Sequence, residues 1–160
     1  MWGKVVNSGM ELLTGEYRNT LDEKGRILFP TRLRNELFAE SDKNVLIITQ
    51  AFDHCLWLYT LDEWKNISSK IMETASPFNA RNSLVLRHFI APAQEVELDK
   101  AGRLSIPQSL REYAHLSKDC VVLGINKYME LWDAEAYAKY LGENEDSLKE
   151  AAEALSSISF

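Results

Sequence analysis

The chain has little of what secreted and membrane proteins use. Among its 160 residues only Cys55 and Cys120 are cysteines, without CxxC spacing and each within an apolar stretch. We therefore expect reduced, buried thiols rather than a structural disulfide. No apolar run approaches the ~20 residues of a membrane span, and the first residues lack the unbroken apolar core of a secretory signal. These absences predict a soluble, cytoplasmic protein with no membrane partner.

Groups that carry catalysis are equally scarce. Three histidines and two cysteines do not form a zinc spacing. His54 and Cys55 are adjacent, and neighbouring positions of a strand face opposite ways, which argues against a Cys–His pair. No glycine-rich phosphate loop is present. We therefore expect no enzymatic activity, no cofactor, no metal and no small-molecule substrate.

The net charge of −6 argues against a nucleic-acid partner only until its distribution is considered. Residues 130–160 contain eight acids and two lysines, so this tail carries the whole excess. Residues 18–34 hold five cations against two acids, and residues 99–111 hold three against one. The chain thus has two local basic islands, which fit either a nucleic-acid contact or an ordinary solvated face.

The basic islands coincide with an internal duplication. "LDEKGR" at Leu21–Arg26 returns as "LDKAGR" at Leu98–Arg103. Aligned over residues 22–37 and 99–114, the copies share Asp, Gly, Arg, Pro, Leu and Arg, where average usage predicts about one identity. Hydrophobic patterning predicts the same unit twice: strand, turn, strand, short helix, strand, strand, longer helix.

Turn chemistry explains part of the repeated motif. Gly25 and Gly102 can supply the positive φ of a tight turn, and the preceding Asp22 and Asp99 can accept hydrogen bonds from turn amides. The pattern predicts a β-hairpin at each copy. The proline that follows suits the first turn of a helix. Asp, Gly and Pro therefore have a structural explanation.

The arginine after each turn glycine is not explained in this way. Arg26 and Arg103 could fold back onto the aspartate four residues earlier, although an exposed pair is worth only ~0–1 kcal/mol. They could instead reach outward into a DNA groove, with Lys24 and Lys100 on phosphate. Spacing alone leaves both interpretations open.

These segments resemble the MraZ family of bacterial transcriptional regulators. The similarity rests on "GEYRNTLDEKGRILFP", "LDKAGRLSIPQSLREYA" and "INKYMELWD", and covers roughly residues 14–141. It implies an α+β fold, a double-split β-barrel of the swapped-hairpin, AbrB-like type, formed by two pseudo-repeats with flanking helices. It also implies assembly into a homo-oligomeric ring.

The same resemblance implies sequence-specific binding of double-stranded DNA at repeated promoter boxes. The family regulates, usually as a repressor, the division and cell-wall gene cluster that includes its own gene, so a nucleoid-associated location follows. The implied DNA contacts are Arg26 and Arg103, then Lys24 and Lys100, with Arg18, Arg32 and Arg34 as further phosphate candidates; Asp22, Gly25, Asp99 and Gly102 shape the turns. Because Ala101 stands where the first copy has Lys24, we expect the first turn to bind phosphate more strongly.

The expected organisation has five parts. They are an N-terminal extension (1–13), a first repeat (14–75), a linking helix (76–93), a second repeat (94–142) and an acidic helical tail (143–160). We expect Trp57, Tyr59, Trp64 and Trp132 to pack in the core or at a subunit contact. An alternative function is an antitoxin-like or adaptor module whose acidic tail binds a basic protein.

Overall fold

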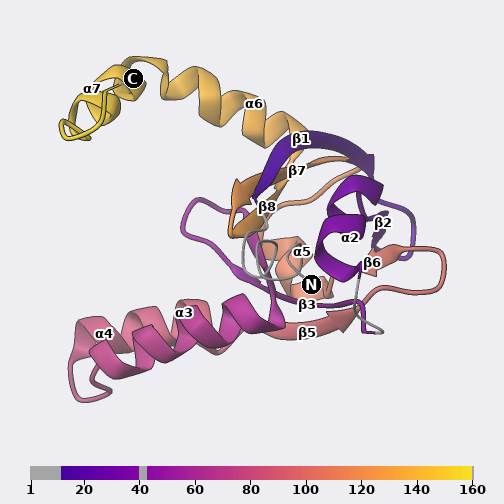
Figure 1. Ribbon diagram of the computed structural model, residues 1–160, viewed down its shortest axis with the longest axis horizontal. Coiled ribbons are helices and arrows are strands. Elements are labelled where there is room, and N and C mark those ends of the chain that lie inside the picture. The colour runs from indigo at the N-terminus through magenta and orange to yellow at the C-terminus, as the bar shows by residue number, and fades with distance from the viewer. Residues whose placement is uncertain (1–11, 40–42, 160) are drawn as a thin grey trace, which may run out of the picture.

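The computed structural model describes residues 12–39 and 43–159, and it contains the predicted unit twice (Figure 1). The N-terminal extension lies almost wholly outside the described residues. The first copy comprises β1 (Leu13–Thr20), β2 (Arg26–Leu28), α2 (Thr31–Phe38), β3 (Val45–Gln50), β4 (Leu56–Thr60) and α3 (Leu61–Thr74). The second comprises β5 (Gln94–Glu97), β6 (Arg103–Ser105), α5 (Gln108–Tyr113), β7 (Asp119–Asn126), β8 (Tyr128–Asp133) and α6 (Ala134–Glu143).

Three further helical segments complete the chain. Helix α4 (Ala80–Val85) runs directly into the π-helical turn η1 (Leu86–Ile90), between the two copies, and α7 (Glu145–Glu153) follows α6. Within the described residues, no helix is long and apolar enough to cross a membrane.

The two copies interlock in one antiparallel sheet. Its order is β1-β7-β8-β4-β3-β5, and β2 pairs with β6 in a separate two-stranded ribbon. The first strand of each copy thus pairs with the third strand of the other. Exchanging the copies turns the strand order into its own reverse, so a pseudo-two-fold axis passes between β4 and β8 and between β2 and β6.

The prediction of a β-hairpin at each turn is wrong. Each turn forms, but the strands on its two sides separate: β1 pairs with β7, whereas β2 pairs with β6. Pairing across the axis puts Ile27 opposite Leu104, and both are fully buried. Strands β2 and β6 have three residues each, and each buries its central side chain by pairing with the other copy. The α+β class is confirmed, but the six-stranded sheet is open, with β1 and β5 at its edges.

Both faces of the sheet are covered. On β3, Leu46 and Ile48 join the main core with the β2–β6 ribbon and helices α2 and α5, whereas Ile47 faces the opposite side. On that side the sheet packs against α3 and α6 through aromatic residues. Of the aromatic side chains expected in the core, Tyr59 and Trp132 are buried. Trp57 and Trp64 are partly buried.

The polar residues that start helices are placed equivalently in the two copies. Thr60 accepts a hydrogen bond from the Glu63 amide at 3.3 Å and begins α3, and Asp133 accepts one from the Ala136 amide at 3.1 Å and begins α6. The repeated prolines stand one residue before α2 and α5, outside the first helical turn in which they were expected. Cys55 and Cys120 are buried and unbridged, as predicted.

Candidate nucleic-acid interface

The first repeated turn is built around the Asp22 carboxylate. Asp22 Oδ1 accepts hydrogen bonds from the Lys24 and Arg26 amides, both at 2.9 Å, and Oδ2 accepts one from Arg26 Nε at 2.9 Å. The Gly25 amide donates to the Asp22 carbonyl at 3.0 Å, and Gly25 has φ +77°. One aspartate therefore closes the turn and fixes the arginine side chain at the same time.

The second turn reproduces this geometry closely. Asp99 Oδ1 accepts from the Ala101 and Arg103 amides at 2.9 Å, and Oδ2 accepts from Arg103 Nε at 2.8 Å. Gly102 has φ +83°. Of the two interpretations left open by the sequence, the arginine folding back onto its aspartate is the one that the structure adopts, in both turns.

The ion pairs leave most of each guanidinium available. Arginine has five N–H donors, and each aspartate takes only the Nε donor. In the described part of the chain, the Nη groups of Arg26 and Arg103 have no protein acceptor. Their side chains are 23% and 40% exposed. The arrangement holds two oriented, solvent-facing forks that can donate to phosphate or to a base edge.

The same contacts keep the aspartates ionised. A hydrogen bond from the Arg26 amide, followed by one from its side chain, holds the pKa of Asp22 below its usual range. The Arg103 amide and side chain act alike on the pKa of Asp99. Both carboxylates are therefore charged at neutral pH and can orient the arginines.

The two turns lie side by side. The Phe29 amide donates to the Gly102 carbonyl and the Ile106 amide donates to the Gly25 carbonyl, both at 2.9 Å. Figure 1 shows the two loops next to each other beside the β2–β6 ribbon. The pseudo-two-fold axis thus gathers segments about 77 residues apart onto one end of the molecule.

Each turn also receives an arginine from the other copy. Arg111 of α5 lies against Gly25, where an added Cβ would stand 1.4 Å from its Nη1. Reciprocally, Arg34 of α2 lies against Gly102, where a Cβ would stand 2.7 Å from Nη1. Both glycines are buried under these guanidinium groups. The turn glycines are therefore required for close approach as well as for positive φ.

The remaining predicted contacts occupy different surroundings. Lys24 and Lys100 are exposed within the turns. Arg32 forms an exposed i,i+4 pair with Glu36 at 3.7 Å on α2. Arg18, exposed on edge strand β1, borders a shallow hollow with Leu28, Pro30 and Thr31.

Sequence reasoning missed Arg111. It took Arg34 as a phosphate candidate but left out the equivalent residue of the second copy. The signal was present, because Arg34 and Arg111 are the last of the six identities in the aligned repeat. That each would reach the other copy's turn could not be read from the sequence, since it depends on the exchange of strands.

Known proteins match the chain over both copies. A model of the family described as "MraZ protein, putative antitoxin-like" matches residues 12–88 and again residues 89–157. The chain belongs to the MraZ family. The resemblance inferred from the repeated turns is thereby confirmed, and each matched segment contains one Asp–Arg turn.

Curated relatives are similar over nearly their whole length. The transcriptional regulator MraZ of Treponema denticola is 57% identical over 148 residues, which cover 92% of this chain and 100% of the relative. The proteins of that name from two strains of Treponema pallidum are both 48% identical over 145 residues, covering 91% of this chain and 95% of theirs.

Proposed function

We propose that this protein is a transcriptional regulator that binds double-stranded DNA through its two Asp–Arg turns. The observation that carries the proposal is the pair of matching turns, each with an arginine fork held by an aspartate and both at one end of the fold. Arg26 and Arg103 are the base-reading contacts, and Lys24 and Lys100 contact phosphate. Arg34 and Arg111 add positive charge beneath the turns.

We propose a wider role that membership of the family and the internal repeat support. The protein binds repeated promoter boxes upstream of a division and cell-wall gene cluster that includes its own gene, and it represses them. One chain offers only two short turns, so tight binding requires several chains linked on tandem boxes. A homo-oligomeric ring of double-split barrel units supplies this linkage, with the β2–β6 ribbon closing the core side of each open sheet.

A gel-shift or anisotropy titration on duplex DNA from upstream of the protein's own gene tests the proposal. Arg26→Ala and Arg103→Ala should each weaken binding roughly 5- to 150-fold, because one well-placed arginine–base pair is worth about 1–3 kcal/mol. The matched control is Lys139→Ala on the exposed side of α6, which removes one cation far along the chain from either turn. Unchanged affinity in both arginine variants would reject these turns as the DNA contact.

A second candidate is favoured by the acidic C-terminal segment. Helix α7 contains no buried residue, and residues 143–159 are almost all exposed. An antitoxin-like or adaptor protein could use this surface to bind a basic protein, consistent with the family's description. Deleting residues 143–160 should then abolish a protein complex while DNA affinity stays the same; loss of DNA affinity alone would count against it.

A further inference from the structure

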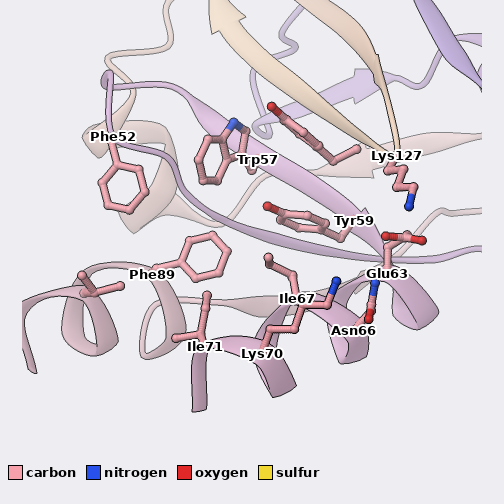
Figure 2. A pocket seen from close by; sticks show the side chains of 12 residues that line it. Phe52, Trp57, Tyr59, Glu63, Asn66, Ile67, Lys70, Ile71, Phe89 and Lys127 are labelled. Carbon is pink, nitrogen blue, oxygen red and sulfur yellow. The ribbon is translucent and has the colours of Figure 1, made fainter. Parts of the chain in front are cut away.

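An apolar groove lies on the side of the sheet away from the main core. It has a volume of about 490 Å³ and lies between strand β4 and helix α3. Figure 2 shows the rings of Trp57, Tyr59 and Phe89 converging on it, with Ile67 and Ile71 of α3 opposite. Trp57 meets Phe89 edge-on, with ring centroids 5.7 Å apart. The aromatic packing makes the groove a preformed apolar surface.

The groove continues onto a projecting helical arm. We call residues 61–90 the α3–α4 arm; neither α3 nor α4 has a fully buried residue. Val85 lines the groove and is 37% exposed, and Met72, Phe78 and Leu84 are exposed further along the arm. A small ligand would cover the groove alone and leave these residues in water. A longer, helical occupant would cover the groove and these residues together.

A second projecting arm is also unpartnered. Residues 134–159, the C-terminal arm, comprise α6 and α7. Leu141 of α6, Leu148 of α7 and Leu155 just beyond α7 are 48%, 69% and 50% exposed. Of 14 exposed large hydrophobic residues in the described part of the chain, ten lie on the two arms. Each arm therefore exposes an apolar surface that the single chain leaves uncovered.

The two arms differ in charge. The C-terminal arm has six acids against two lysines. The α3–α4 arm together with Lys127 has five cations against three acids, and Lys70 and Lys127 line the groove. Figure 2 shows Lys127 at one end beside Glu63 and Asn66, and Lys70 on α3 beside Ile67 and Ile71. An acidic arm with exposed leucines thus complements an apolar groove that is lined by two lysines and one acid.

We propose that the C-terminal arm of one copy docks in the groove and along the α3–α4 arm of a second copy. Figure 1 shows α7 at the top of the view and the α3–α4 arm at the bottom, well apart, and no residue of the C-terminal arm is among those that line the groove, so one chain's own arm does not fill its own groove. The contact joins two different surfaces and is heterologous. Repetition of such a contact closes a ring or extends a filament. The inference rests on the proposed assembly and names the surfaces that form it.

The test uses two full-length variants that damage different surfaces. Leu148→Glu places a charge at the exposed leucine of α7, and Val85→Glu places one at the groove. Masses are measured by light scattering after size exclusion, and circular dichroism melts confirm the fold. Leu28→Glu, at a 54% exposed leucine outside both arms, is the matched control.

Wild type and Leu28→Glu should form the same multi-subunit species, whereas each arm variant alone should be monomeric. Mixed in equal amounts, the two variants should form a 1:1 pair, because one retains an intact groove and the other an intact arm. A monomeric wild type, an arm variant that keeps the wild-type mass, or a mixture that stays monomeric would each overturn the inference. If Val85→Glu unfolds, the double variant Lys70→Glu/Lys127→Glu replaces it with the same expected outcomes.

DNA binding separates this inference from the proposed function. The 1:1 pair and the monomeric variants retain intact Asp–Arg turns. They should bind a single box more weakly than wild type binds tandem boxes. Failure of assembly with DNA binding preserved refutes the interface alone, whereas assembly without any DNA binding refutes the regulator alone.

Discussion

The substitution Gly25→Ala perturbs the first turn in two ways that can be separated. At φ +77° an alanine occupies the left-handed region, which costs about 1–2 kcal/mol. Its Cβ would also stand 1.4 Å from Arg111 Nη1, so the guanidinium must leave. Because that group is the end of a flexible side chain, its displacement adds little to the loss of stability. Its effect should instead be seen in DNA affinity.

Thermal unfolding and a DNA titration measure the two effects. For a chain of this size, a loss of 1–2 kcal/mol lowers the Tm by about 2–8 °C. Gly142→Ala is the matched control, since Gly142 lies near the end of α6 with nothing within 4 Å of an added Cβ, and it should raise stability by about 0.5–1 kcal/mol.

The DNA titration includes Arg111→Ala and the double variant. If Gly25→Ala acts on DNA by expelling Arg111, the two losses of affinity should not add. An unchanged Tm would refute the argument from φ. Additive losses of affinity, or none, would refute the placement of Arg111 at the first turn.

Two further outcomes follow from ionisation and burial. The pKa of both turn aspartates is lowered in the folded protein, so their contribution to stability is complete above the unfolded value of ~3.9 and is lost as the pH falls through the lower folded value. When unfolding is followed between pH 6 and 2, the free energy of unfolding should therefore fall more steeply for wild type than for Asp22→Asn/Asp99→Asn. Equal slopes would contradict this assignment. Burial raises the pKa of Cys120 to about 11 and raises that of Cys55 further, so both thiols should resist a thiol reagent at pH 8 until the protein unfolds. Rapid modification of the native protein would show that solvent reaches these thiols and would contradict their burial.

The local chemistry of the turns could be predicted from the sequence, and the partners of the strands could not. Asp22, Gly25 and Arg26 lie within five residues, so their hydrogen bonds depend on turn geometry that the residue types specify. The pairing of Ile27 with Leu104 depends on a segment far along the chain. Turn residues alone predict a hairpin, but burial of both copies in one core favours pairing of the strands between the copies.

The surroundings of the candidate site were only partly predictable, for the same reason. The duplication predicted two equivalent arginine forks. It did not indicate that Arg111 would cover Gly25 or that Arg34 would cover Gly102, because each crosses between copies. The phosphate candidate Arg32 lies in an exposed ion pair with Glu36, a contact that the i,i+4 spacing on α2 permits. Contacts within a repeat could thus be predicted from the sequence, and contacts between the repeats could not.

If the two turns bind DNA as proposed, the axis between β2 and β6 affects the direction in which the protein lies on the duplex. A protein with two equivalent turns can rotate by half a revolution and present the same arginine forks, so the turns alone give each chain almost no polarity. The only break in equivalence within the turns is at two positions, where Glu23 and Lys24 are matched by Lys100 and Ala101. These few charges, together with Arg32, which stands opposite Ser109 in the aligned repeat, would decide the orientation of each subunit on an asymmetric box.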